Sequence, residues 1–251
     1  MDDSDTFDPE AFSRLAGAES GHFWFEERRE LLAWAIARYF PAATTFCEIG
    51  CGTGFVLEAI ARRLPRLALT GIDSYPQGLA FAGSRLPPRV RLERGSILDE
   101  PGDAHHDVVG CFDVLEHIPD DAGAVRAINA RINPGGGVII TVPQHPALWS
   151  AADEIGHHQR RYTRAELLRL IAKAGWEPLR VTSFISFLLP ILYARRNQSL
   201  GREAALAELH PSGPANAVGR FALRLERNLI QAGVSFPIGG SLLVVARKPS
   251  S

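Results

Sequence analysis

Apolar residues occur along this chain in short runs separated by longer segments of mixed polarity. The runs are rich in valine, isoleucine, leucine and phenylalanine, and turn-forming or charged residues bound them, which is typical of buried strands. The pattern predicts strands at 44–49, 67–72, 90–93, 106–112, 137–142, 177–184 and 239–246.

The segments between these runs carry apolar residues at a helical period. Helices are predicted at 27–39, 54–64, 75–86, 121–132, 163–174 and 215–231. Residues 133–137, Asn-Pro-Gly-Gly-Gly, are expected to form the turn into the fifth strand. Strands alternate with helices, which predicts an α/β fold: a doubly wound, Rossmann-like, mostly parallel sheet of seven strands. A helical insertion at about 186–235, between strands six and seven, is longer than an ordinary connection, so we interpret it as a cap or a partner surface.

Composition narrows the class of protein. The 251 residues, 46% of them hydrophobic, fit one α/β domain with an insertion. The formal net charge of −1 argues against broad nucleic-acid binding, which needs a basic excess. Three cysteines without zinc-type spacing predict buried thiols in a reducing compartment. The start lacks the basic and apolar regions of a signal peptide, and no apolar run has transmembrane length, so a cytoplasmic location is expected.

A glycine-rich turn follows the first predicted strand. The sequence Gly50-Cys51-Gly52-Thr53-Gly54 is preceded by Glu48, and Asp73 ends the second strand. Such an acid accepts hydrogen bonds from ribose hydroxyls in doubly wound sheets. Phe55 occupies the place of the third glycine of a dinucleotide motif, and Glu48 repels a diphosphate but attracts a cationic amino group. S-adenosylmethionine fits a ligand with ribose, adenine and an amino group but no diphosphate.

This arrangement closely resembles the first motif of class I S-adenosylmethionine-dependent methyltransferases, and the likeness extends over most of 46–248. The resemblance implies a reversed seventh strand and S-adenosylmethionine as the cofactor. The segment 112–120, Phe-Asp-Val-Leu-Glu-His-Ile-Pro-Asp, resembles the ubiquinone-biosynthesis-like small-molecule branch. The cofactor-binding residues that it implies are Trp24, Arg28, Glu48, Gly50, Cys51, Gly52, Gly54, Asp73, Ser74, Ser96, Ile97 and Phe112.

The sequence departs from the family's pattern at one position, and the resemblance extends to the N-terminal part of the chain. Ser96 stands where the family usually has an acid that contacts the adenine amine, and a hydroxyl makes a weaker contact than a carboxylate. Residues 22–25, His-Phe-Trp-Phe, with Arg28 resemble an N-terminal aromatic helix that folds over the cofactor. We therefore expect a helical lid at 1–43 and a catalytic domain at 44–251; the other interpretation of the aromatic helix is ordinary amphipathic packing.

Histidines are the candidate general bases, because their ordinary pKa is near neutral. His117 lies just beyond the fourth predicted strand, where such sheets place their active sites. It serves equally well as a brace of the following helix against Glu116. His145 is the second candidate, with a turn residue between two prolines as the alternative.

The loop after the fifth strand supplies the candidate substrate residues Trp149, His157, Arg160 and Tyr162. The arginine can clamp a carboxylate or phosphate, and the aromatic residues can line an acceptor pocket. Surface charge and core packing are the respective alternatives. Adjacent histidines such as His157 and His158, without a third ligand at recognisable spacing, do not indicate a metal site, so no metal is expected.

The sequence thus predicts methyl transfer from S-adenosylmethionine to an oxygen, nitrogen or carbon nucleophile of a small molecule. The alternatives are a nicotinamide-dependent oxidoreductase and a catalytically silent cofactor-binding partner protein. No nucleic-acid partner is expected, and the chain is expected to be a monomer or homodimer. Contact of the apolar segment 184–193 with a membrane is the less favoured interpretation of that segment, after packing on the sheet or a dimer contact.

Overall fold

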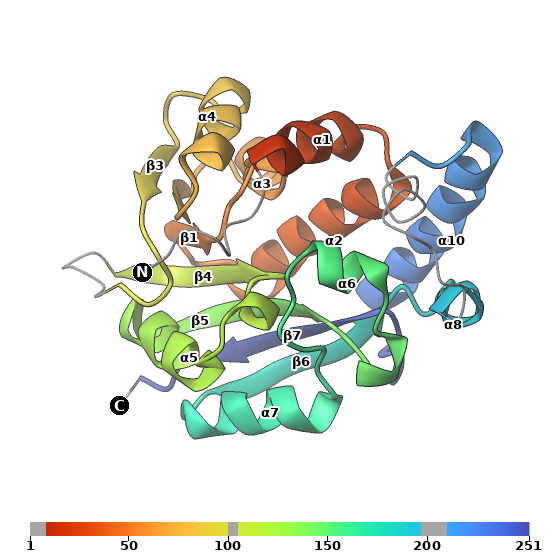
Figure 1. Ribbon diagram of the computed structural model, residues 1–251. Helices are drawn as coiled ribbons and strands as arrows, with labels where there is room; N and C mark the ends of the chain where they lie inside the picture. The colour runs from red at the N-terminus through yellow and green to blue at the C-terminus, as the bar shows by residue number, and fades with distance from the viewer. Residues whose placement is uncertain (1–8, 100–104, 197–209, 251) are drawn as a thin grey trace.

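The computed structural model describes residues 9–99, 105–196 and 210–250. Within these ranges, seven strands form one sheet in the order β3-β2-β1-β4-β5-β7-β6 (Figure 1). The strands are β1 (Thr45–Ile49), β2 (Ala68–Asp73), β3 (Arg91–Arg94), β4 (His106–Phe112), β5 (Ile132–Pro143), β6 (Glu177–Phe184) and β7 (Ser241–Arg247). The first five pair in parallel, and β7 runs antiparallel to both β5 and β6. The predicted doubly wound, mostly parallel sheet with a reversed last strand is confirmed.

Helices cover both faces of this sheet. The helices are α1 (Pro9–Glu19), α2 (Phe23–Tyr39), α3 (Phe55–Arg63), α4 (Pro76–Arg85), α5 (Asp121–Ala130), α6 (Ala151–Ile155), α7 (Arg164–Lys173), α8 (Leu189–Arg196) and α10 (Gly213–Gln231), with the short 3-10 turns η2 (Leu115–His117) and η3 (Pro146–Leu148). Because side chains alternate between faces along a strand, Ile139 of β5 packs with α2, α3 and α4, whereas Val138 and Ile140 pack with α5 and α7. Each face of the sheet therefore has its own apolar cluster.

The order of the strands reverses at β1, which pairs with β2 on one side and β4 on the other. Ile49 is in register with Ile72 and with Cys111, so the turns after β1, β2 and β4 emerge at the same edge of the sheet. Open α/β sheets bind ligands at such a switch point. The predicted motif residues are thereby brought to one place.

Most boundaries of the predicted elements lie within two residues of those in the structure, but the starts of α2 and β5 differ by more. Helix α2 begins at Phe23 rather than at residue 27, because the Nδ1 of His22 accepts the Trp24 amide at 3.1 Å and caps the helix. The expected turn at 133–137 is wrong, since these residues belong to β5. The glycine-rich stretch is accommodated by a register irregularity against β4, at which Gly135 has a φ of +78°.

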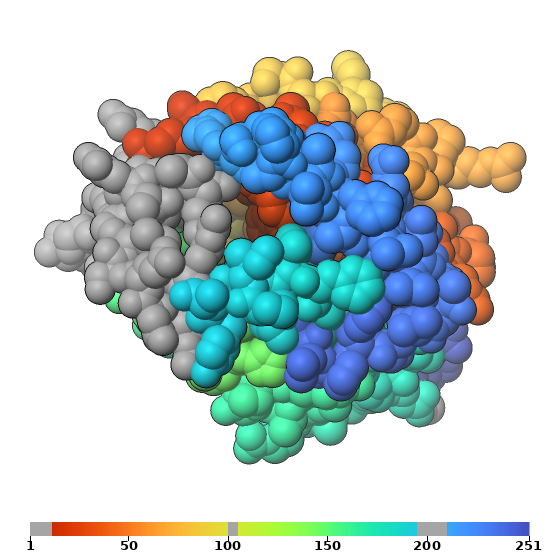
Figure 2. Space-filling view, turned by 90° about the vertical axis from the view of Figure 1, so that its right-hand side faces the viewer, coloured from red at the N-terminus to blue at the C-terminus, as the bar shows by residue number. Residues whose placement is uncertain are grey.

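The predicted insertion between β6 and β7 contains α8 and α10, and its residues 197–209 lie outside the described ranges. Helix α10 packs on α2: the Asn216 side chain accepts the Phe23 amide at 2.9 Å, and Arg227 pairs with Glu27 at 2.9 Å. Figure 2 shows α8 in cyan and α10 in blue around a hollow in which N-terminal residues, in red, are visible. Among the described residues, no helix is both long and apolar enough to cross a membrane.

Candidate active site at the carboxyl ends of the strands

The turn after β1 is built from three glycines in the left-handed region. Gly50, Gly52 and Gly54 have φ values of 73°, 50° and 76°. The amides of Gly50 and Cys51 both donate to the Ile72 carbonyl, at 2.8 and 3.1 Å, which holds the turn against β2. A Cβ at Gly50 would overlap the Val114 side chain. The glycines therefore let the turn approach both β2 and the segment after β4.

Asp73 ends β2 and faces this glycine turn. Its Oδ2 accepts the Gly52 amide at 2.7 Å, and its Oδ1 accepts the Tyr75 amide at 2.9 Å. Burial raises the pKa of the Asp73 carboxyl, and these two backbone hydrogen bonds oppose the rise. The carboxylate is thus fixed in orientation at the switch point, with lone pairs left for a ligand.

Glu48 is a buried acid in β1 with an unsatisfied atom. The residue is 3% exposed, and its Oε2 has no hydrogen-bond partner among the described residues. Burial raises the pKa of Glu48 to about 8; Asp73 and Glu19 add to the rise, and Arg28 opposes it. An unpaired buried acid of this kind favours a ligand that brings a positive charge or a hydrogen-bond donor.

Helix α2 reaches across the site to the end of β4. Arg28 Nη2 lies 2.6 Å from Asp113 Oδ2, and its guanidinium lies 5.3 Å from the centre of the Trp24 ring. Asp113, just past β4, has a φ of +55°. Arg28 and Trp24 therefore lie at the site, as the resemblance implies.

Helix α1, which the sequence prediction missed, is joined to the glycine turn by a buried polar network. Thr53 Oγ1 donates to Glu19 Oε1 at 2.5 Å, and Arg85 Nη1 donates to Glu19 Oε2 at 2.6 Å. Burial raises the pKa of Glu19, while Thr53 and Arg85 lower it. The polar partners Thr53 and Arg85 lie 34 and 66 residues further along the chain, so no local sequence pattern revealed this contact.

The remaining expected cofactor residues lie at or just after the carboxyl ends of β2, β3 and β4. Ser96 follows β3; its amide donates to Asp99 Oδ2 at 2.5 Å, and its Oγ accepts the Leu98 amide at 3.2 Å. Ile97 and Phe112 are buried, at 4% and 5% exposure. Ser74 is exposed directly after Asp73. The adenine amine is a hydrogen-bond donor, so Ser96 could bind it only through the remaining lone pair of its Oγ. The contact of Ser96 with the cofactor stays a prediction.

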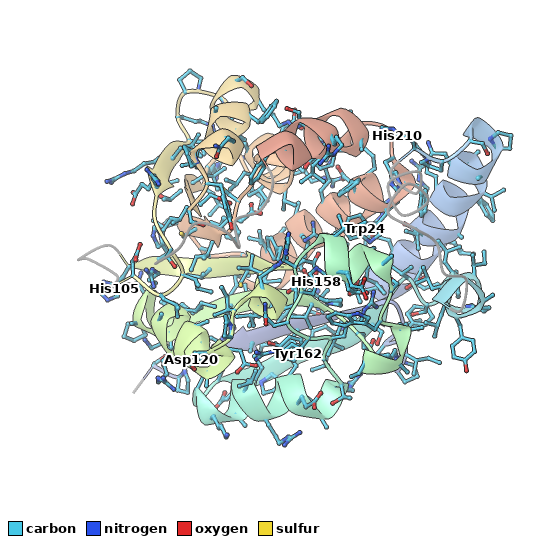
Figure 3. All side chains as sticks on the ribbon, viewed as in Figure 1. Trp24, His105, Asp120, His158, Tyr162 and His210 are labelled. Carbon is cyan, nitrogen blue, oxygen red and sulfur yellow. The ribbon has the colours of Figure 1, made fainter. Side chains whose placement is uncertain are left out.

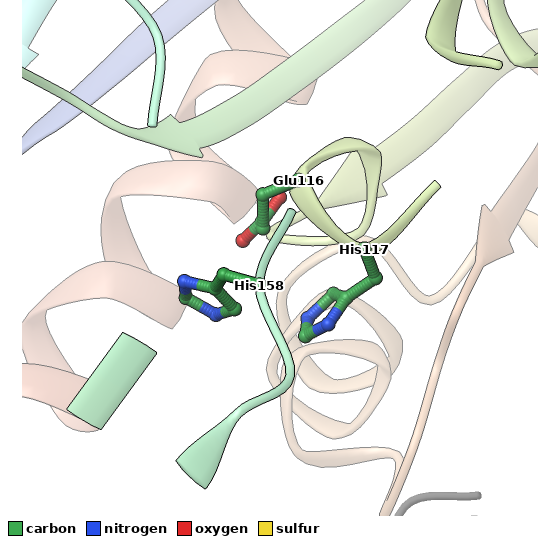
Figure 4. A group of neighbouring side chains, drawn as sticks. All are labelled: Glu116, His117 and His158. Carbon is green, nitrogen blue, oxygen red and sulfur yellow. The ribbon is translucent and has the colours of Figure 1, made fainter. Parts of the chain in front are cut away.

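The turn after β4 and the loop before α7 bring together three side chains with metal-binding atoms. One ligand atom from each of Glu116, His117 and His158 lies within 4.8 Å of the others (Figure 4). The His117 and His158 rings meet edge to face, with centroids 4.7 Å apart. Burial lowers the pKa of His117 to about 4, and His158 lowers it further, against a smaller opposing effect of Asp113. His117 is therefore neutral at neutral pH and a weaker base than an exposed histidine.

His158 is held in place by a buried acid that sequence reasoning did not single out. His158 Nδ1 lies 2.8 Å from Asp153 Oδ1, and Arg161 contacts both Asp153 oxygens, at 2.7 and 2.9 Å. These hydrogen bonds lower the pKa of Asp153 to about 2 against the effect of burial. Figure 3 shows His158 and Trp24 towards the carboxyl end of β4, far from His105 just before β4.

The candidate substrate residues do not all lie together in the structure. His157 and Trp149 are exposed, the tryptophan at 37%. Tyr162 is buried and donates to Asp121 Oδ2 at 3.0 Å, and Arg160 pairs with the same carboxylate at 2.8 Å. Arg160 and Tyr162 thus brace the start of α5 in this structure, and their substrate contacts stay predictions.

His145, the second candidate base, lies just past β5 with a φ of +63°. Its Nε2 is buried without a hydrogen-bond partner among the described residues. Burial lowers the pKa of His145, and the nearby Arg161 lowers it further. Its catalytic role also stays a prediction.

Comparison with known proteins agrees with this geometry. Residues 22–181 match the sequence profile of a family described as "Methyltransferase domain". The chain therefore belongs to that family of methyltransferase domains. The match begins at the cap of α2 and ends within β6, so α1, α8 and α10 lie outside it.

The chain is similar to a ubiquinone biosynthesis O-methyltransferase of Pseudomonas paraeruginosa, with 32% identity over 143 residues, or 50% of this chain and 60% of that protein. The chain thus spans about three fifths of that curated relative. Among solved structures it resembles phosphoethanolamine N-methyltransferase 2 of Haemonchus contortus in complex with S-adenosyl-L-methionine (TM-score 0.56, 19% identity, 87% of this chain and 52% of the other). It also resembles the [4+2]-cyclase SpnF (TM-score 0.57, 21% identity, 88% and 80%). These two likenesses show the fold alone.

Proposed function

We propose that this protein transfers a methyl group from S-adenosylmethionine to an oxygen, nitrogen or carbon nucleophile of a small molecule. The observation that carries the proposal is the unpaired Oε2 of Glu48 beside the glycine turn and Asp73. A buried acid at this position suits a ligand with an amino group and a ribose, because a cationic amino group favours the ionised carboxylate, whereas a diphosphate disfavours it.

The residues present fit this cofactor. Asp73 accepts hydrogen bonds from ribose hydroxyls, Glu48 receives the amino group, and Arg28 is near enough to the site to meet a carboxylate. Ser96 and Ile97 border the adenine position. When bound, the cofactor supplies the methyl group on a positively charged sulfur, and the protein aligns the nucleophile with it.

The segments around the site exclude water from it. We propose that residues 1–43 form a lid, because α1 is fixed to the glycine turn through Glu19 and α2 reaches β4 through Arg28. Residues 186–235 form a cap through the contacts of α10 with α2. Residues 1–8 and 197–209 of these two segments lie outside the described ranges.

The acceptor enters from the side of the turn after β4 and the loop before α7. The name of the Pseudomonas relative supports a small-molecule acceptor with a reacting oxygen. His117 or His145 acts as the general base if the acceptor is protonated at working pH. Trp149, His157, Arg160 and Tyr162 are the proposed acceptor contacts, and no metal was expected from the sequence.

Two alternatives are tested by the same experiment. A nicotinamide oxidoreductase is disfavoured by Phe55, whose ring lies under the Arg29 guanidinium at 4.0 Å and fills the position of the third glycine. Ser96, which replaces the usual acid of the family, is the feature that favours a catalytically silent cofactor-binding protein. The resemblance to a [4+2]-cyclase shows that this fold occurs in a protein named for a different reaction.

The test is calorimetry with S-adenosylmethionine, S-adenosylhomocysteine and NAD at matched concentrations. We expect micromolar binding of the first two and none of NAD; binding of NAD alone would overturn the proposal. Formation of S-adenosylhomocysteine with a panel of hydroxylated and amino acceptors then separates an enzyme from a silent binding protein.

A further inference from the structure

We propose that Glu116, His117 and His158 form a binding site for one divalent transition-metal ion at the acceptor side of the active site. The proposal departs from the sequence-based expectation of no metal. Adjacent histidines gave no third ligand in the sequence, but the fold places His158 opposite Glu116 and His117, which come from a different segment (Figure 4).

The kind of donor atoms selects the kind of metal. Two imidazoles and one carboxylate suit zinc, iron, cobalt or nickel, whereas magnesium and calcium prefer ligands made of oxygen alone. The three donor atoms lie within 4.8 Å of one another. Bonds of about 2.0–2.2 Å to a tetrahedral ion put ligand atoms roughly 3.4 Å apart, so a contraction of about 1.4 Å at most completes the site.

Glu116 is the second observation that points to a cation. The residue has no exposed surface, and neither carboxylate oxygen has a hydrogen-bond partner among the described residues. Burial of an unpaired acid is unfavourable, and a metal ion in contact with one of its oxygens removes that cost. A purely structural role for the segment explains its backbone contacts but not a buried acid without a partner.

His158 is oriented as a metal ligand by the group behind it. Its Nδ1 faces Asp153 Oδ1 at 2.8 Å, which leaves Nε2 for the ion. Asp153 has no exposed side-chain surface and is fixed by Arg161 and by the Ser150 amide, the latter at 2.8 Å. Carboxylate–histidine–metal arrangements use this geometry to fix the tautomer and the direction of the ring.

The position of the site gives the ion a function, and this step rests on the proposed methyl transfer. Glu116 and His117 directly follow the segment that contains Asp113, the partner of Arg28 at the cofactor side. With three protein ligands, the ion keeps an open position for an oxygen of the acceptor. An acceptor hydroxyl bound to the ion would lose its proton more easily, to His145 or to solvent, because His117 is itself bound to the ion. The oxygen would then take the methyl group from the cofactor sulfur, which leaves in S-adenosylhomocysteine. The class of acceptor inferred is therefore a hydroxylated compound that is methylated on oxygen.

The experiment uses the full chain, stripped of metal with a chelator and then titrated with Co²⁺ while the visible absorption is recorded. We expect saturation at one equivalent, with absorption bands of a cobalt ion bound to nitrogen and oxygen. Competition with Zn²⁺ should abolish these bands. Absence of binding to the wild-type chain overturns the proposal.

Two variants and one control identify the ligands. Glu116→Gln and His158→Ala should each weaken Co²⁺ binding at least tenfold, whereas His105→Ala, an exposed histidine at the opposite end of β4, should leave it unchanged. Equal binding by Glu116→Gln and the wild type would overturn the assignment. Glu116→Gln keeps the shape of the side chain and removes a buried acid, so it should fold, and Zn²⁺ should raise the Tm of the wild type but not of this variant.

Calorimetry with S-adenosylhomocysteine on the same samples separates this inference from the proposed function. Cofactor binding without cobalt binding refutes the metal site and leaves the methyltransferase proposal intact. Cobalt binding without cofactor binding refutes the proposed function and its account of the acceptor, but it leaves the metal site in place.

Discussion

Arg28 of α2 and Asp113 at the end of β4 form an ion pair across the candidate site, with 2.6 Å between Nη2 and Oδ2. The two residues are far apart in the sequence, and their side chains are 10% and 21% exposed. The pair therefore connects the N-terminal helices to the edge of the sheet where the acceptor is proposed to bind.

A double-mutant cycle measures this connection. We expect Arg28→Met and Asp113→Asn to show a coupling of about 1–3 kcal/mol in the free energy of unfolding, because each single change leaves a partly buried charge unpaired. Urea unfolding at pH 7 gives the four values. A coupling below roughly 0.3 kcal/mol would mean that solvent screens the pair and that α2 is held on the sheet by its other contacts.

Asp73 should dominate cofactor affinity. Asp73→Ala removes the proposed charge-assisted hydrogen bonds to ribose and also frees the Gly52 and Tyr75 amides, which shape the turn. Each charge-assisted bond is worth roughly 1.5–3 kcal/mol, so S-adenosylhomocysteine affinity should fall at least tenfold. Calorimetry makes the measurement, with Asp120→Ser as the control, since Asp120 caps α5 and otherwise makes only an exposed ion pair with Arg126 at 3.7 Å, and serine retains the cap. An unchanged Kd would show that Asp73 does not contact the ligand.

We expect the Thr53 hydroxyl to help to hold α1 against the glycine turn. Thr53→Val removes the hydroxyl that donates to the buried Glu19 and accepts from Arg85, at 2.5 and 2.9 Å. We expect a loss of about 1.5–3 kcal/mol in the free energy of unfolding and faster amide exchange in 9–19. Thr53→Ser keeps the hydroxyl and should behave nearly as the wild type. If exchange in α1 is as slow in the valine variant as in the wild type, the lid is held elsewhere.

The sequence predicted those parts of the fold that depend on local pattern. Apolar runs located the strands, and the glycines with Asp73 located the switch point, because both features act over short stretches of chain. The predicted boundaries of helices and strands were wrong where tertiary contacts determine them. The His22 cap lengthened α2, and pairing with β4 drew 133–137 into β5.

The sequence located the residues around the glycine turn but not the polar contacts that hold the rest of the candidate site. Glu48 and Asp73 belong to a motif, whereas Glu19 and Asp153 act through partners distant in the chain, which no spacing reveals. The pair His157 and His158 shows the limit most clearly. Sequence alone could not distinguish the exposed ring from the one that faces Glu116, because a loop has no periodic pattern of inward and outward positions.

Titration of Glu48 should lower the free energy of unfolding as pH rises. Its pKa is about 8 in the folded chain against 4.5 for the ordinary group, so between these values the folded chain binds the extra proton. The free energy of unfolding then decreases with pH across this window, and the contribution is constant below about 4.5 and above about 8.

Glu48→Gln removes the titration while keeping the shape of the side chain. The free energy of unfolding of the variant minus that of the wild type should therefore increase from pH 5 to pH 8.5, which urea unfolding at several pH values measures. Glu166→Gln is the control: hydrogen bonds from Thr163 lower the pKa of this exposed acid, so its stabilising effect is lost only at more acidic pH. A constant difference between Glu48→Gln and the wild type over this range would mean that Glu48 is already ionised at pH 5. Arg28 would then supply the positive charge that stabilises the ionised Glu48. A cationic ligand would not be needed beside Glu48, and this argument for S-adenosylmethionine would fail.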